Sequence, residues 1–150
     1  MMLSASQIAT LDRGYDQLLE VCNNLETLAD TLPDRVGVAR HLHLIDSVEQ
    51  VVGLTSLLEE TILFPLMEAY SSADLKMTVE RLRREHIADR STADELRDLF
   101  GAFLEERSGI SADAVGYLLR SFFESVRRHV HAERAMLQLL QGCHETETLH

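Results

Sequence analysis

The stretch HVHAERAMLQLL, residues 129–140, resembles an earlier stretch, SLLEETILFPLM, at residues 56–67. When the two are aligned, Glu133 falls on Glu60 and His129 falls on Ser56. Both stretches carry apolar residues three and four positions apart, which is the pattern of a helix with one buried face. The pair therefore indicates that the chain uses one helical unit twice.

A second pair of stretches supports this duplication. LDRGYDQLL, at residues 11–19, aligns with LRREHIADR, at residues 82–90, and places Tyr15 on His86. The two alignments need nearly the same offset along the chain, so a whole helix hairpin is repeated with a small difference in loop length.

Helical periodicity extends over most of the chain, with little punctuation. The Leu32-Pro33-Asp34 loop, the capping run Ser71-Ser72-Ala73-Asp74 and Gly142 mark the boundaries. Short connections between long helices favour antiparallel neighbours, so we expect an all-α, up-down antiparallel four-helix bundle forming a single domain over residues 1–150. The expected helices lie at about residues 6–30, 39–70, 74–107 and 112–141, followed by a tail at residues 142–150 in which residues 144–150 are expected to be disordered. Pro65 lacks a backbone donor, so a kink is expected near Thr61.

Composition limits the class of protein. The chain has 150 residues, 45% hydrophobic and 5% aromatic, which is enough for one domain with a core that needs no disulfide or metal to fold. A formal net charge of -11 opposes nucleic acid and anionic membranes as partners. Two cysteines, the absence of a secretion signal and the absence of an apolar run near membrane length lead us to expect a soluble cytoplasmic protein.

Several polar residues of the four helices are expected at one height. His129 and Glu133, four residues apart, share a helix face, whereas His131 points elsewhere. His86 lies as far before the expected helix end at position 107 as Glu133 lies after the expected start at position 112. Because the rise per residue is the same in both helices, the two side chains are level. Similar counts across the other connections complete one layer: Tyr15, Ser56, Glu60, His86, His129 and Glu133.

This layer has the chemistry of a metal site. Imidazole and carboxylate groups together suit iron, zinc or manganese, and the interior of a helix bundle is where such sites form. Two glutamates in an apolar interior would otherwise be costly unless they were paired or protonated. His41 and His43 lie about 20 Å from the layer along their helix and are expected at the surface or the hairpin end.

The residues of the layer resemble the hemerythrin-like family, also called the HHE cation-binding domain, over nearly the whole chain. The family motif has a His on the first helix, His-x-x-x-Glu before Leu-Phe-Pro on the second, a His on the third and His-x-x-x-Glu on the fourth. His86, His129 and Glu133 match the last two helices, and Glu60 matches the carboxylate of the second. Two family histidines are replaced, by Tyr15 and Ser56.

The resemblance implies a non-haem iron site, with zinc or manganese as alternatives. In the family such residues typically hold a di-iron centre that binds oxygen or serves in iron handling, redox or nitric-oxide responses. With two histidines lost, we expect one ion, or an asymmetric di-iron centre in which Tyr15 is a phenolate ligand. Tyr15 as a core aromatic stays an equal alternative, and Ser56 is expected to hold a water or to bond its own backbone.

Three functions follow as hypotheses. The first is a sensor, store or redox protein that responds to dioxygen or nitric oxide, rather than an oxygen carrier or a turnover enzyme. The second is a metal-free helical module that works through a regulatory protein partner. The third is a di-iron oxidase or peroxidase. The sequence leaves open whether the chain acts alone or as a homodimer.

Overall fold

The computed structural model describes the backbone of residues 2–40, 42–106 and 109–148, and side chains within these segments up to Gly142. Throughout this part of the chain the regular structure is helical, with no strand, so the all-α prediction is confirmed. The elements are α1 (Ala5–Thr31), α2 (Arg35–Arg40), α3 (Leu42–Leu58), the π-helix η1 (Glu59–Leu63), α4 (Phe64–Ala69), α5 (Ala73–Leu104) and α6 (Ala112–Thr148).

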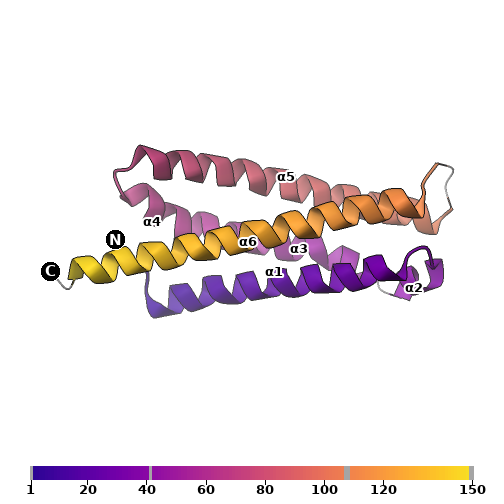
Figure 1. Ribbon diagram of the computed structural model, residues 1–150, viewed down its shortest axis with the longest axis horizontal. Helices are drawn as coiled ribbons and strands as arrows, with labels where there is room; N and C mark the ends of the chain where they lie inside the picture. The colour runs from indigo at the N-terminus through magenta and orange to yellow at the C-terminus, as the bar shows by residue number, and fades with distance from the viewer. Residues whose placement is uncertain (1, 41, 107–108, 149–150) are drawn as a thin grey trace.

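The long helices lie side by side along the length of the molecule (Figure 1). α1 packs against both α3 and α6, and α5 packs against the same two helices. The short helix α2 lies at one end, and α4 lies near the opposite end beside α5 (Figure 1). Residues from four different helical segments can therefore meet in the centre.

Side-chain caps set the helix starts where the sequence supplies them. Ser4 and Gln7 form a reciprocal capping box at the start of α1. The Ser72 hydroxyl accepts a hydrogen bond from the Leu75 amide at 3.3 Å, which begins α5 within the predicted capping run. Ser111 accepts from the Ala114 amide in the same way before α6.

The helix predicted at residues 39–70 is divided into shorter elements. α3 passes into the π-helix η1, which ends directly before Phe64 and Pro65. The Phe64 amide donates to the carbonyl of Glu59, five residues earlier, so the ladder is π rather than α here. The departure from regular helix that Pro65 predicts near Thr61 thus takes the form of one wide turn.

The other helix bounds differ from expectation mainly at the C-terminal side. α5 ends at Leu104, and the left-handed φ of +57° at Glu106 belongs to the turn that follows. α6 does not stop at Gly142 but continues to Thr148, so the predicted helix end near residue 141 is wrong, and residues 144–148 of the predicted disordered segment are helical. A single glycine costs only about 1 kcal/mol in a helix interior, which is too little to end a long helix.

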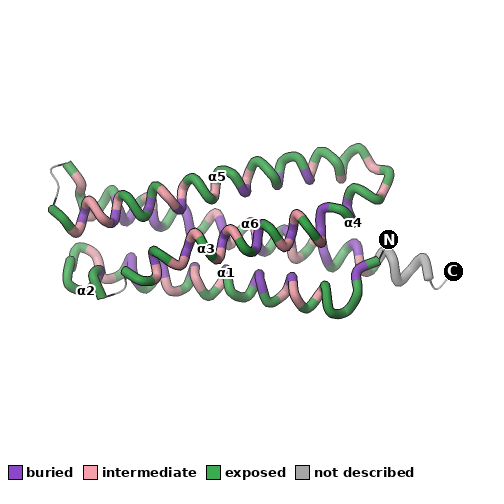
Figure 2. The backbone as a smooth tube through the Cα atoms, turned by 180° about the vertical axis from the view of Figure 1, so that it is seen from behind, coloured by how far each residue is buried: buried purple, intermediate pink, exposed green. Residues whose placement is uncertain are grey.

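Buried residues recur along each of the long helices (Figure 2). Large apolar side chains that are almost completely buried fill the interior: Leu11, Leu25, Leu28, Phe64, Phe100, Phe103, Leu119 and Leu137. Five polar or charged side chains are buried among them: Thr55, Ser56, Glu59, His86 and Glu133. Buried charged groups require partners, so these residues define the place where function is sought.

One helical stretch, Leu42–Ala69, is long and apolar enough to cross a membrane by length and composition alone. The expectation that no segment approaches this length is therefore wrong on that criterion. Its most apolar window is 44% buried, and Val48 and Val52 contribute to the core. Core helices of folded proteins pass the same test.

Candidate metal centre

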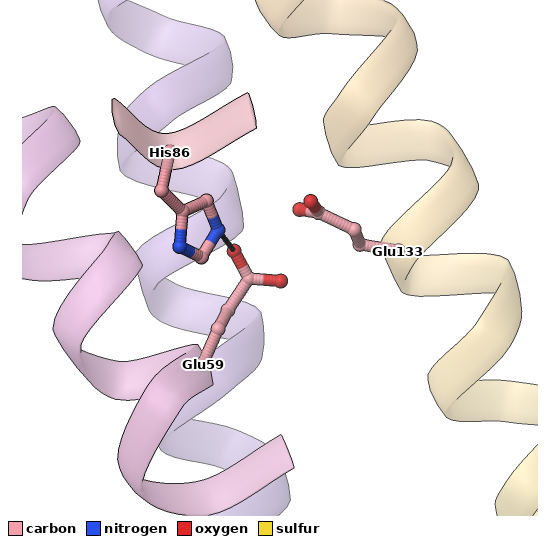
Figure 3. Close-up of side chains that lie close together, drawn as sticks. All are labelled: Glu59, His86 and Glu133. Carbon is pink, nitrogen blue, oxygen red and sulfur yellow. Dashed lines mark hydrogen bonds and ion pairs between the residues drawn. The ribbon is translucent and has the colours of Figure 1, made fainter. Parts of the chain in front are cut away.

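Three buried side chains from three elements converge on one point. Glu59 comes from η1, His86 from α5 and Glu133 from α6 (Figure 3). Each offers a ligand atom, and these atoms all lie within 4.8 Å of one another. The three residues are between 2% and 5% exposed, so water does not screen their charges effectively.

Tyr15 joins this group through Glu59. Its hydroxyl donates to Oε2 of Glu59 at 3.0 Å, and its side chain is completely buried. The preceding Gly14 allows α1 to approach closely, because a Cβ at that position would lie 3.2 Å from Cδ1 of Leu58. Gly14 therefore helps to bring the phenol to the height of the carboxylate.

His86 is bonded at both ring nitrogens. Nε2 lies 3.1 Å from Oε1 of Glu59, and Nδ1 lies 3.1 Å from Oε1 of Glu60. The ring also stacks on Phe64, with 5.4 Å between centroids and 14° between planes. Phe64 belongs to the Leu-Phe-Pro run, so this motif supports the imidazole directly.

The π-helix explains how consecutive glutamates reach the same ring. A π turn closes over one more residue than an α turn, so neighbouring side chains project with a smaller angle between them. Glu59 points into the core at 2% exposure, whereas the side chain of Glu60 is 31% exposed at the outer edge of His86. The carboxylate of the central group is therefore Glu59, one residue before the predicted Glu60.

His129 lies beside the central group rather than within it. Its Nδ1 is 3.2 Å from Oδ2 of Asp89 and its Nε2 is 3.6 Å from Oε2 of Glu85, both on α5. The side chain is 27% exposed. The hydrogen bond with Asp89 raises the pKa of His129 above its ordinary value, although burial opposes this change.

A cavity of about 20 Å³ connects the two sets of residues. This is room for about one water-sized species. Its polar lining consists of Thr55, Ser56, Glu59, His86, Asp89, His129 and Glu133. Three of these are carboxylates and two are imidazoles, and none of the described lining residues is Lys or Arg. The cavity lining is thus rich in carboxylate and imidazole groups, which are suitable ligands for a cation.

The pKa values of the buried acidic groups are raised. Burial, followed by the nearby charge of Glu59, raises the pKa of Glu133 to about 10, from an ordinary value of 4.5. Burial and the same carboxylate raise the pKa of Tyr15. Burial lowers the pKa of His86, but its hydrogen bonds and charge interactions with Glu59 and Glu60 outweigh this, so the net pKa is raised.

The predicted site residues divide into three groups. Tyr15, His86 and Glu133 lie together with Glu59, while Glu60 and His129 lie at the outer side. Ser56 is buried and lines the cavity without contributing a charged ligand.

The residues expected outside the site stay outside it. His43 and His131 are exposed, and His41 lies outside the described residues.

Sequence reasoning missed two residues, Glu59 and Asp89. Glu59 stands beside the predicted Glu60 in the Glu-Glu pair, and nothing in the helical periodicity marks a π turn there. Asp89 lies three residues after His86, a spacing that places both on one helix face, and this was the available signal.

The donor set fits a bound cation. Two buried carboxylates and one imidazole converge, a phenol lies beside them, and the adjacent cavity has room for one small species. Oxygen and nitrogen donors of this kind suit iron, manganese or zinc. Burial and the charge of Glu59 raise the pKa of Glu133, and a bound cation would oppose this change by stabilising the carboxylate.

Comparison with known proteins agrees with this chemistry. The family model of the hemerythrin HHE cation binding domain matches residues 6–140. No curated protein and no solved structure matches the chain. The match covers all four segments that supply the central side chains. The chain belongs to the hemerythrin HHE cation-binding domain family.

Proposed function

We propose that the protein binds non-haem iron at Glu59, His86 and Glu133, with Tyr15 as a fourth donor. The observation that carries this proposal is the convergence of three buried ligand atoms within 4.8 Å beside a cavity whose described lining has no basic Lys or Arg. A divalent cation would offset the two carboxylates, which are costly to bury without one. The bound ion would supply Lewis acidity and redox chemistry.

The pairing of His129 with carboxylates of α5 favours one bound ion over two. His129 has both ring nitrogens within reach of Asp89 and Glu85, so in this arrangement it is not free to face the central group. An asymmetric di-iron centre would need His129 and Asp89, which line the same cavity, to exchange their mutual contact for a second ion. We therefore propose a mononuclear site, with a second ion at the His129 side as the alternative.

The proposed fold for this site is an up-down antiparallel four-helix bundle formed as one domain from a duplicated hairpin. α1, the series α3–η1–α4, α5 and α6 take the four places, and their packing in a closed ring supports this assignment. In space Glu133 pairs with Glu59 rather than with Glu60, a shift of one position from the sequence alignment, and the π turn supplies this difference. A cytoplasmic location remains part of the proposal.

The proposed role is sensing of oxygen, redox state or nitric oxide, or iron handling, rather than oxygen transport. Tyr15 and Ser56 replace two imidazoles of the family pattern, so the coordination of a symmetric di-iron oxygen carrier is incomplete. The cavity is also small, about 20 Å³, which fits a diatomic or water-sized ligand better than an organic substrate. This favours a binding protein over a turnover enzyme.

Elemental analysis tests the proposal. The protein purified from iron-supplemented cells should contain close to one iron per chain, and His86→Ala should contain none. His131→Ala is a matched control, since His131 is an exposed histidine of α6. Absence of metal from the wild type, or equal iron in wild type and His86→Ala, would refute iron binding at this site. Zinc or manganese in place of iron would keep the site and change the proposed role.

A metal-free interaction module is the second candidate, because the central side chains already satisfy one another. Tyr15 donates to Glu59, and His86 bridges Glu59 and Glu60. A protein that binds no metal and unfolds at the same temperature with and without iron would favour this candidate. Melting curves of chelator-treated and iron-loaded protein separate the two functions.

A further inference from the structure

His86 is held between carboxylates on its two opposite ring nitrogens. Oε1 of Glu59 lies 3.1 Å from Nε2, on the side of Glu133 and the cavity. Oε1 of Glu60 lies 3.1 Å from Nδ1, on the other edge of the ring. The two glutamates are neighbours in sequence, yet they form hydrogen bonds with different nitrogen atoms of one imidazole.

Stacking on Phe64 restricts the plane of the His86 ring. Phe64 stacks on one face of His86, and the guanidinium of Arg83 lies over the Phe64 ring, 5.1 Å from its centroid. Stacking fixes the plane of the imidazole but permits the ring to be flipped by half a turn about its bond to Cβ. A hydrogen-bond acceptor at Nδ1 is required to make one of the two flipped states the favoured one.

We propose that Glu60 is a positioning residue, which accepts the Nδ1–H of His86 and so presents Nε2 to the metal-binding group formed with Glu59 and Glu133. The assignment rests on the proposed iron-binding function. It differs from the sequence expectation, in which Glu60 itself was a ligand. An imidazole that binds a metal through one nitrogen generally donates its other N–H to an oxygen, and that oxygen holds the tautomer and the ring.

The location of Glu60 supports an outer role. Its side chain is 31% exposed, whereas Glu59, His86 and Glu133 are all buried. Among the described residues, Glu59, His86 and Glu133 have ligand atoms close enough to share one ion, and Glu60 is not part of this group. Glu60 instead contacts Nδ1 of His86, the ring nitrogen on the side away from Glu133 (Figure 3). An exposed carboxylate retains much of its hydration, so Glu60 accepts from Nδ1 at low desolvation cost.

Two substitutions separate positioning from charge. Glu60→Gln removes the charge and keeps a carbonyl acceptor, whereas Glu60→Leu removes both. Glu68→Gln is the control, because Glu68 is a partly exposed glutamate of α4 that pairs with Arg83 rather than with the imidazole. Thermal unfolding of each variant checks that the fold is kept.

The first readout is made on metal-free protein. The Nδ1 proton of His86, observed by ¹⁵N-edited NMR, should be protected from exchange in the wild type, shifted but still protected in Glu60→Gln, and lost in Glu60→Leu. An Nδ1 proton that is equally protected in Glu60→Leu would overturn the assignment. This readout needs no metal, so it tests the hydrogen bond from Nδ1–H to Glu60 separately from iron binding.

The second readout is the affinity for Fe²⁺ alone, measured without oxygen. Loss of such an outer acceptor typically weakens metal binding about 10- to 100-fold. We expect a loss in that range for Glu60→Leu, a smaller loss for Glu60→Gln and no change for Glu68→Gln. Equal losses in both Glu60 variants would assign Glu60 to charge or direct ligation and overturn positioning. A wild type that binds no Fe²⁺ would instead refute the proposed function, and with it any positioning toward an ion.

Discussion

Replacing Glu133 by glutamine should make the metal-free protein more stable at neutral pH while removing its capacity for iron. Glu133 is 5% exposed, and burial together with the charge of Glu59 raises its pKa to about 10. In the unfolded chain the same group titrates near 4.5. Glutamine has nearly the same shape and carries no ionisable proton, so it removes this difference.

The magnitude follows from the linkage between proton binding and folding. Below pH 4.5 both states of Glu133 are protonated, and the group contributes no pH dependence. Between pH 4.5 and about 10 the unfolded state ionises while the folded state keeps its proton, so stability is lost as the pH rises. The slope is about 1.36 kcal/mol per pH unit, which amounts to roughly 3 kcal/mol at pH 7.

Urea unfolding of chelator-treated protein at pH 5, 6, 7 and 8 measures this effect. We expect Glu133→Gln to exceed the wild type by less than about 1 kcal/mol at pH 5 and by roughly 3 kcal/mol at pH 7. Glu124→Gln, at an exposed position of the same helix, should follow the wild type at every pH. With Fe²⁺ at about 100 times its Kd, the wild type should gain about 2.7 kcal/mol and Glu133→Gln nothing. A metal-free Glu133→Gln that is no more stable than the wild type at pH 7 would refute the reasoning.

Three further outcomes are expected. Tyr15→Phe removes the 3.0 Å hydrogen bond to Glu59 and should cost the metal-free protein about 1–3 kcal/mol in urea unfolding; an unchanged midpoint would show that the bond contributes nothing. His86→Ala should abolish Fe²⁺ binding in calorimetry, and His129→Ala should weaken it less, because only His86 belongs to the central group; the reverse order would move the site to the outer side. Fe²⁺ affinity should fall on acidification between pH 8 and 6, because the pKa values of both His86 and Glu133 are raised and protons compete with the ion at both ligands; a pH-independent affinity over this range would contradict ligation by these two residues.

The helical fold and the height of the site could be predicted from the sequence because both depend on periodicity. Apolar spacing marks the buried faces, and counting residues along helices of regular rise brings Tyr15, His86 and Glu133 to one layer. These three side chains do lie together around Glu59. Counting residues therefore gave the relative heights of these side chains where they lie on regular α-helices.

Periodicity failed where the backbone departs from the α-helix. The alignment of repeats selected Glu60, because it assumes the same turn in both hairpins. The π turn from Glu59 to Leu63 rotates the chain, so Glu59 faces the core and Glu60 faces the edge of His86. Counting residues along a regular α-helix does not predict this rotation.

The position of His129 depended on a partner from another helix. Spacing of four residues placed His129 on the same face as Glu133, which is correct, since both line the cavity. Its ring is held 3.2 Å from Asp89, however, and this contact arises from the packing of α5 against α6. Such side-chain pairing between helices cannot be predicted from the periodicity of either helix.

Anomalous diffraction at the iron edge, from crystals of iron-loaded protein, tests the central claim most directly. We expect one peak, bounded by Glu59, His86 and Glu133 and adjacent to the hydroxyl of Tyr15. The same data collected below the edge should lack this peak, which identifies the element. An iron-loaded crystal with no peak at these side chains, or with its peak only at a surface site, would contradict the assignment of this cluster as the metal centre.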